Sequence, residues 1–207
     1  MIARNQVIRD GRLVAILRGS RPDRLVAGAL VLVDEGVQAL EFPLTSPGAL
    51  EAIADAAGAL DGQAMVGAGT VRNVDDARRA IDAGARFLVS PSLSVPVIKY
   101  ALAHDATALP GTFTPTEIAT ATEAGAELVK LFPAASHRPE FLRQVRVPLP
   151  DVGVVPTGGI EVEAAAAWLG AGAVALGIGS PLTGDSLETG DFAQLRKRAR
   201  AWKAGVS

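Results

Sequence analysis

Four segments of the sequence share one plan: DEGVQAL (34–40), DAGARFL (82–88), EAGAELV (123–129) and LGAGAVAL (169–176). In each, a helical pattern ends, a glycine follows, and a short apolar run begins. Glycine is typical just past a helix C-terminus because it adopts positive φ without strain. The glycines expected in that place are Gly36, Gly84, Gly125 and Gly170. Repetition of this plan predicts a repeated unit of one strand and one helix.

Working outward, short apolar runs alternate with longer helical patterns along the whole chain. Eight runs are predicted as strands, at residues 13–17, 39–42, 64–67, 87–89, 106–109, 128–132, 153–156 and 173–176. Helical patterns lie between them, for example at 23–35, 47–60, 74–83 and 162–169. The alternation predicts an α/β fold with a mostly parallel sheet. Eight evenly spaced runs favour a single (β/α)8 TIM barrel, with an open doubly wound sheet as the alternative.

Length and composition limit the possible classes of protein. The 207 residues are predicted to form one domain, 1–207, which is short for a barrel of about 250 residues and leaves little room for loop insertions. The net charge of −2 gives no reason to expect nucleic acid or an anionic membrane as a partner. Cysteine is absent, which excludes disulfides and permits a cytoplasmic location. Neither a signal peptide nor a membrane span is expected.

In a β/α barrel, the active site lies where the strands run into the following loops. Eight residues occupy such positions, several of them polar: Arg18, Glu41, Thr70, Pro91, Pro110, Lys130, Thr157 and Ser180. A collection drawn from many strands is more informative than any single member.

Lys130 interrupts an apolar strand in ELVKLFP (127–133) and shares a strand face with Leu128 and Phe132. Neither face of a barrel strand suits an unpaired ammonium. An amine shielded from water loses its proton more readily and can then attack a carbonyl. Only four of the 20 basic residues are lysines, and arginine cannot act as such a nucleophile. The alternatives are a lysine that reaches the barrel mouth or a plain phosphate ligand.

Glu41 is the only acid inside a predicted strand. A carboxylate at the barrel mouth can move protons between substrate and water. Arg18 ends the neighbouring strand and can hold a substrate carboxylate in a bidentate pair. A structural salt bridge between Arg18 and Glu41 is the alternative for both.

Two glycine-rich turns, PTGG (156–159) and GIGS (177–180), follow the last two predicted strands. Barrels often bind phosphate on backbone N–H groups at these two loops, although either turn alone is a weak signal. No metal site is predicted, because the two histidines lie far apart without ligand spacing. His104 is expected at a helix C-terminus. For His137 a solvated loop position is favoured over a substrate contact.

Seven motifs occur in one order and spacing: VAILRG (14–19), EFPLTSP (41–47), VGAGTV (66–71), VSPS (89–92), KLFPA (130–134), PTGG and GIGS. Together they resemble the family of 2-keto-3-deoxy-6-phosphogluconate aldolase and its 6-phosphogalactonate counterpart, over nearly the whole chain.

This resemblance implies a homotrimeric Schiff-base aldolase that needs no metal or other cofactor. Its substrate would be a 2-keto-3-deoxy acid 6-phosphate, cleaved to pyruvate and glyceraldehyde 3-phosphate. Lys130 would form the imine and Glu41 would be the acid/base. The substrate contacts implied by the resemblance are Arg18, Thr70, Pro91, Thr157, Gly158, Gly159, Gly179 and Ser180.

The chain departs from the family pattern at two places. Some phosphogluconate aldolases have an arginine in a Leu-Arg-Thr context where this chain has Leu44, Thr45 and Ser46, so Arg18 is expected to take over the carboxylate. The motifs are mixed between the two types and leave the configuration at C4 open. His137 and Arg138 stand where relatives often carry glycine, either as a new cation near the phosphate or as a surface change.

Three other functions compete with this one. A 4-hydroxy-2-oxoglutarate aldolase would keep the imine and not need the phosphate. A phosphosugar isomerase or epimerase would use Lys130 only as an electrostatic ligand. A sugar-phosphate binding module would bind without turnover.

Overall fold

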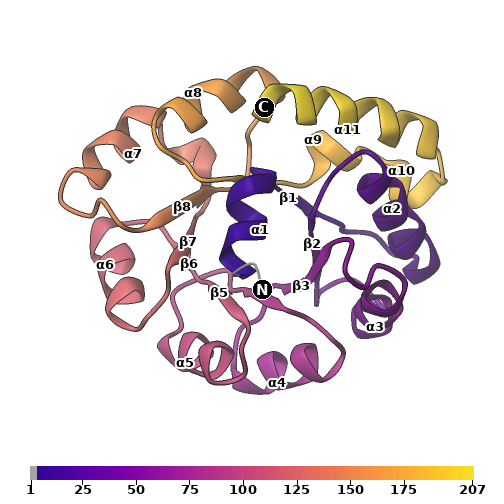
Figure 1. Ribbon diagram of the computed structural model, residues 1–207, viewed down its shortest axis with the longest axis horizontal. Coiled ribbons are helices and arrows are strands. Elements are labelled where there is room, and N and C mark those ends of the chain that lie inside the picture. Colours follow the sequence, from indigo (N-terminus) through magenta and orange to yellow (C-terminus); the bar gives the residue numbers. More distant parts are fainter. Residues whose placement is uncertain (1–3) are drawn as a thin grey trace.

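Strands and helices alternate along the chain in the computed structural model, which describes residues 4–207 (Figure 1). The strands are β1 (Leu13–Ile16), β2 (Ala39–Pro43), β3 (Met65–Gly69), β4 (Phe87–Val89), β5 (Thr107–Leu109), β6 (Gly111–Thr112), β7 (Leu128–Leu131), β8 (Gly153–Pro156) and β9 (Leu176–Ile178). The helices are α1 (Arg4–Gly11), α2 (Pro22–Asp34), α3 (Ala49–Ala59), α4 (Val74–Asp82), α5 (Val95–Ala103), α6 (Pro115–Glu123), α7 (Pro139–Arg146), α8 (Ala165–Gly170), α9 (Ser180–Thr183), α10 (Ser186–Thr189) and α11 (Phe192–Val206). Short 3-10 turns span Ala134–Ser136 and Val162–Ala164.

All strand pairs are parallel, which confirms the predicted α/β class. The strands form two sheets, one of six strands in the order β5-β4-β3-β2-β1-β9 and one of three in the order β6-β7-β8. An isolated parallel bridge between Thr157 and Gly177 connects the end of β8 to β9. The described strands therefore do not form the one continuous eight-stranded ladder that the periodicity predicts.

Pro110 explains why strand pairing is interrupted between the first sheet, which ends with β5, and the second sheet, which begins with β6. It lies between β5, which pairs with β4, and β6, which pairs with β7. Proline has no N–H to donate to a ladder, so pairing stops there. Its carbonyl still accepts a hydrogen bond from the Lys130 amide at 2.8 Å. The fifth predicted strand is thus followed by a short additional strand that belongs to the second sheet.

Two boundaries near the C-terminal end differ from the prediction. The last strand was expected at 173–176 and is found at Leu176–Ile178, because ladder pairing with β1 begins only where Leu176 meets Leu13. Gly170 is the last residue of α8, and the glycine with positive φ is Gly172, at +102°. The other three predicted glycines do adopt positive φ: Gly36, Gly84 and Gly125.

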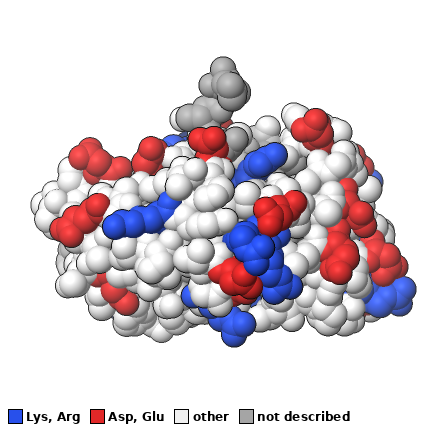
Figure 2. Space-filling model, turned by 90° about the horizontal axis from the view of Figure 1, so that it is seen from below, with Lys and Arg blue, Asp and Glu red and all other residues white. Residues whose placement is uncertain are grey.

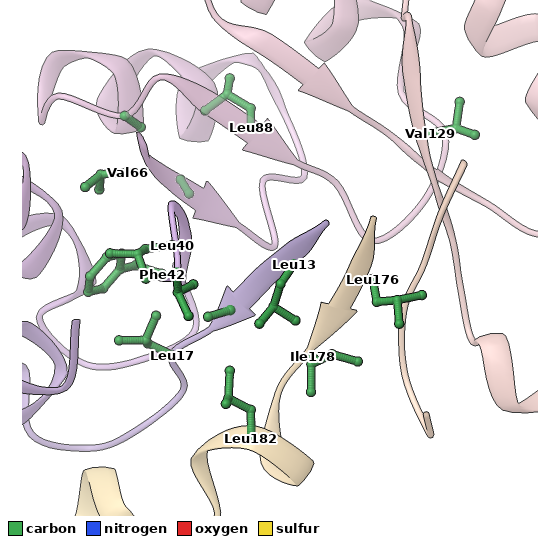
Figure 3. Close-up of a cluster of buried hydrophobic side chains, with 14 of the residues drawn as sticks. Leu13, Leu17, Leu40, Phe42, Val66, Leu88, Val129, Leu176, Ile178 and Leu182 are labelled. Carbon is green, nitrogen blue, oxygen red and sulfur yellow. The ribbon is translucent and has the colours of Figure 1, made fainter. Parts of the chain in front are cut away.

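Alternate strand residues divide the buried side chains into two clusters. The inner cluster contains Ile8, Val14, Ala39, Met65, Phe87, Val89, Leu109, Leu128, Val155 and Ala175. The outer cluster contains the residues between them in sequence, such as Leu13, Leu40, Leu88 and Val129, packed with the helices. Figure 3 shows part of the outer cluster, where Leu182 of α9 approaches Ile178 of β9. A period of two in the strands thus sends one face inward and the other toward the helices.

Helix α1 covers one end of the inner cluster, and its Ile8 is fully buried there. In Figure 1 it lies within the ring of strands, while α2 to α8 and α11 lie around the outside. Asn5 connects two of the strand ends to this helix: it donates to Glu127 Oε2 at 2.6 Å and accepts from Thr107 Oγ1 at 2.7 Å. The amino end of the strands is therefore closed by the chain itself.

Figure 2 shows the side of the molecule that carries α4 and α5, where acidic and basic side chains lie interspersed. This agrees with the net charge of −2. Between residues 4 and 207, the helices include none that could cross a membrane.

Candidate active site

Strand alternation places Lys130 and Glu41 on the inner face. Lys130 follows Leu128 by two positions in β7, and Glu41 follows Ala39 by two in β2; both of those apolar residues belong to the inner cluster. The two charged groups thus form the next layer of the interior, toward the carboxyl ends of the strands. The predicted shared face of Lys130 and Leu128 is confirmed.

Lys130 is buried, with 8% of its surface exposed. Its Nζ lies 4.8 Å from the centroid of the Phe132 ring, a contact that favours a cation over the aromatic face. Thr112 Oγ1 donates to the Lys130 carbonyl at 3.1 Å, and this holds the strand in place. The lysine therefore does not extend into solvent, as the alternative of a lysine at the barrel mouth required.

Glu41 is buried as well, with 3% exposed. Burial raises the pKa of its carboxyl above the ordinary value, and the positive charges of Lys130 and Arg18 oppose part of that shift. A carboxyl whose pKa is raised exchanges protons more readily near neutral pH, which suits an acid/base.

Glycines in the strands around the site provide room for its side chains and for a neighbouring loop. A methyl group on Gly69 would overlap the Glu41 carboxylate, and one on Gly177 would overlap the Thr157 hydroxyl. A Cβ at Gly111 would meet the carbonyl of Pro91, so this glycine lets the loop after β4 approach the strand that neighbours Lys130. The close packing of the site thus depends on residues without side chains.

Thr70 adopts a left-handed backbone conformation, with φ at +58°. For a β-branched residue this is strained, on the order of 1–3 kcal/mol. Hydrogen bonds on either side hold it there: the Leu44 amide donates to the Gly69 carbonyl at 2.8 Å, and the Val71 amide to the Val89 carbonyl at 3.0 Å. Strain of this kind concentrates at functional sites.

Arg18 follows β1, and its guanidinium donates to Thr45 Oγ1 at 2.9 Å. Among the described residues, no ion pair joins Arg18 to Glu41. The salt bridge considered as an alternative is therefore not formed, and the cation is available to another anion.

The glycine turns lie at the carboxyl ends of β8 and β9. Gly158 and Gly159 both have positive φ, at +91° and +71°. Thr157 before them is buried and donates to the Val155 carbonyl at 3.2 Å. Ile178 is the last residue of β9 and Ser180 the first of α9, so Gly179 alone lies between the strand and the helix.

One cavity of about 330 Å³ brings all ten predicted site residues together. Its walls include Arg18, Glu41, Thr70, Pro91, Lys130, Thr157, Gly158, Gly159, Gly179 and Ser180. It holds one buried amine, one buried carboxyl, an arginine and two glycine turns. Such a set can form an imine, move a proton beside it and hold anionic groups.

Six further residues line the same cavity and were not predicted: Ile16, Phe132, Ile160, Gly177, Ile178 and Pro181. Phe132 is the most informative, because its ring faces the Lys130 amine. Its position two residues after the lysine, on the same strand face, was the available signal. Gly177 and Ile178 belong to the GIGS motif, although no contact was assigned to them. Ile16, Ile160 and Pro181 are apolar wall residues that no chemical pattern singles out.

The histidines lie elsewhere. His104 caps the end of α5, as predicted. His137 is half-buried between two aromatic rings, 4.2 Å from Phe141 and 4.4 Å from Phe113 between centroids. His137 does lie in a loop and makes no contact with the candidate cavity, as predicted, but it is half-buried and not solvated as expected. Arg138 does not line that cavity either.

A larger cavity of about 460 Å³ opens beside the first and shares Thr70 with it. It lies over the loops after β2 and β3 and includes Thr45, Arg72 and Arg79. Neither buried charge reaches it, so the smaller cavity is the candidate active site. Within residues 4–207, no group of three or more metal-ligating side chains is present.

Known proteins are similar to this chain in sequence and in fold. A family model described as KDPG and KHG aldolase matches residues 4–198. The chain belongs to the KDPG and KHG aldolase family. The 2-dehydro-3-deoxy-6-phosphogalactonate aldolase of Escherichia coli K12 is 36% identical over 179 residues, which cover 85% of this chain and 87% of that protein. The KHG/KDPG aldolase of the same strain is 33% identical, covering 94% and 92%.

A solved structure described as native KDPGal superposes with a TM-score of 0.87 at 34% identity, covering 93% of each chain. The chain is therefore similar to members of this family both in sequence and in fold. The expectation of an aldolase, a carbon–carbon lyase, is confirmed by family membership.

Proposed function

We propose that this member of the KDPG and KHG aldolase family cleaves a 2-keto-3-deoxy-6-phosphohexonate to pyruvate and glyceraldehyde 3-phosphate through a Schiff base on Lys130. The observation that carries the proposal is the buried pair of Lys130 and Glu41 in one cavity. Burying two charges is costly, and an active site is where such a cost is retained.

In this mechanism the neutral amine of Lys130 attacks the C2 carbonyl, and loss of water gives a protonated imine. Glu41, directly or through water, removes the proton of the C4 hydroxyl as the C3–C4 bond breaks. The bonding electrons move into the imine and give an enamine, while glyceraldehyde 3-phosphate leaves. Reprotonation at C3 and hydrolysis then release pyruvate and the free lysine.

The ends of the substrate are assigned by charge. Arg18 would pair with the carboxylate, and Thr70 and Pro91 would bound the pyruvate half. The amides of Gly158, Gly159, Gly179 and Ser180 would hold the phosphate, with Thr157 donating along the chain between them. All of these residues line the cavity, which supports the assignment.

Of the two C4 epimers, we propose the 6-phosphogalactonate form as the preferred substrate. The phosphogalactonate aldolase relative has 36% identity and the KHG/KDPG aldolase relative 33%. Competition between the two epimers in one assay would measure the preference. Activity on unphosphorylated 4-hydroxy-2-oxoglutarate at an equal rate would instead favour the KHG side of the family.

At the level of the whole protein, the proposal is one domain, 1–207, in which the two sheets together make an eight-fold barrel. The Thr157–Gly177 bridge supports closure on one side and the Lys130–Pro110 hydrogen bond on the other. A cytoplasmic homotrimer completes the proposal; it rests on the family resemblance, and light scattering of the purified protein would test the trimer.

The decisive experiment is borohydride reduction with pyruvate, followed by peptide mass mapping. The reduced pyruvyl adduct is expected on Lys130. Lys130→Arg keeps a positive charge and is expected to trap nothing, because arginine forms no such imine. Lys99→Arg, on the exposed face of α5, is the matched control and should trap normally. An unmodified wild-type chain at saturating pyruvate would overturn the covalent mechanism and favour a phosphosugar isomerase or epimerase.

A further inference from the structure

The guanidinium of Arg18 has one hydrogen-bond partner among the described residues, the hydroxyl of Thr45 at 2.9 Å. The two residues come from adjacent parallel strands, which pair through Ile16 and Glu41. Arg18 follows the end of β1 by two positions, and Thr45 follows the end of β2 by two. The contact therefore joins two loops at the mouth of the candidate active site.

The backbone around Arg18 is already held by other groups. The Leu17 amide donates to the Glu41 carbonyl at 2.8 Å, and the Gly19 amide donates to Ser46 Oγ at 3.4 Å. Ser20 donates from its amide and from its hydroxyl to the Glu188 carboxylate of α10, at 2.7 and 2.6 Å. These bonds do not fix the direction of the Arg18 side chain. That side chain is long and exposed, and without a partner it would sample many rotamers.

The positions of the two side chains relative to the cavities differ. Arg18 lines the catalytic cavity together with Thr70, whereas Thr45 lines only the neighbouring, larger cavity. Thr45 is therefore not part of the lining of the cavity that contains Lys130. Its hydroxyl engages Nη1 and leaves the other N–H donors of the guanidinium to form a bidentate pair with a carboxylate.

We infer that Thr45 is a positioning residue, which directs the Arg18 guanidinium toward the carboxylate of the 2-keto acid without touching the substrate. This inference rests on the proposed function and adds to it a residue outside the catalytic cavity. A preorganised arginine loses less freedom on binding than a mobile one, so the contribution belongs to substrate affinity rather than to the chemical step.

The test compares Thr45→Val, which removes the hydroxyl at nearly constant shape, with Thr45→Ser, which keeps it. Borohydride trapping at Lys130 is measured against pyruvate concentration. The half-saturating pyruvate is expected to rise about threefold to tenfold in Thr45→Val, the range for loss of one hydrogen bond. Thr45→Ser should remain near wild type, and the limiting trapping rate should stay within about twofold in both.

Two controls separate positioning from a structural role. Thr116→Val alters another exposed threonine, at the start of α6, and should change nothing. In an Arg18→Met background, Thr45→Val should add no further loss, because Thr45 acts through the arginine. Thermal unfolding of each variant checks the fold, and Thr45→Ala removes the hydroxyl by a second route.

An unchanged half-saturation in Thr45→Val, or a loss that persists in the Arg18→Met background, would overturn the inference while leaving the Schiff-base mechanism intact. A fall in the limiting rate at unchanged half-saturation would overturn it too. A wild-type chain that traps no pyruvate would instead refute the proposed function, and the inference with it. The wild-type control thus distinguishes the two failures.

Discussion

Glu41 and Lys130 are the only charged side chains that are buried among the described residues. Each occupies an inner position of a strand whose preceding inner residue is apolar. A carboxyl placed there costs free energy when it ionises, because water no longer solvates it. The nearby positive charges of Lys130 and Arg18 reduce that cost but do not cancel it, since the pKa of Glu41 remains raised. The buried Glu41 carboxyl therefore lowers the stability of the folded chain at neutral pH, a cost that is consistent with a role in proton transfer.

Glu41→Gln is expected to lower the turnover number on the order of 100-fold to 10,000-fold, the usual contribution of an acid/base. The same variant should be more stable than wild type at neutral pH. Because burial raises the pKa of folded Glu41, the folded chain binds more protons than the unfolded chain between the two pKa values. Wild-type stability therefore falls as pH rises through that window, whereas glutamine carries no such cost.

Thermal unfolding of both proteins from about pH 4 to pH 8 would measure this effect. The difference in Tm should be small at the acidic end and grow as pH rises. Glu51→Gln, at an exposed position of α3, is the control and should show no such trend. A difference that stays constant across the range would mean that ionisation of Glu41 is not its cause.

At the scale of single elements, the strand period predicted which face of β7 carries Lys130, because side chains alternate in any strand. Pairing could not be predicted in the same way. The break at Pro110 depends on which neighbour each half of the segment meets, and the start of β9 depends on the register with Leu13. Both features depend on contacts between residues far apart in the sequence, which local periodicity cannot predict.

Strand β3 offers an element-scale prediction, because Gly69 at its end faces Glu41. A methyl group there would overlap the carboxylate, so Gly69→Ala is expected to displace Glu41 and reduce turnover at least 10-fold, by loss of acid/base geometry (an order-of-magnitude estimate). Gly58→Ala, at an exposed position near the end of α3 with no atom within 4 Å of the added Cβ, should leave turnover unchanged. It should raise stability by about 0.5–1 kcal/mol through helix propensity.

Steady-state kinetics and thermal unfolding of the two alanine variants would test this contrast. Full activity in Gly69→Ala would show that the Glu41 carboxylate has room to shift without loss of function. A loss of turnover in Gly58→Ala would show that the effect of Gly69→Ala is not local.

For the molecule as a whole, the parallel arrangement explains why the candidate site was predictable. Parallel strands bring all their carboxyl ends to one side, so residues read from many strand ends must gather in one place. All ten did so. A contact made across loops, such as that of Thr45 with Arg18, depends on side-chain direction, and no spacing rule supplies it.

The opposite end of the same strands is covered by a helix. There α1 closes the inner cluster, and Asn5 connects Thr107 and Glu127 to the helix. The two ends are separated by the apolar layer that contains Leu128 and Ala39. Substitutions at the two ends should therefore affect different properties of the protein.

Asn5→Ala is expected to lower stability by about 1–2 kcal/mol, because it removes two hydrogen bonds and leaves a part-buried hydroxyl without its acceptor. For a chain of this size, that corresponds to a fall in Tm of roughly 2–8 °C. The pyruvate half-saturation and the trapping rate should not change, since the packed inner layer lies between Asn5 and the cavity. Gln6→Ala, on the exposed face of α1, is the control for helix propensity. Altered trapping in Asn5→Ala at unchanged Tm would mean that the two ends are coupled through the inner cluster and that the separation of roles fails.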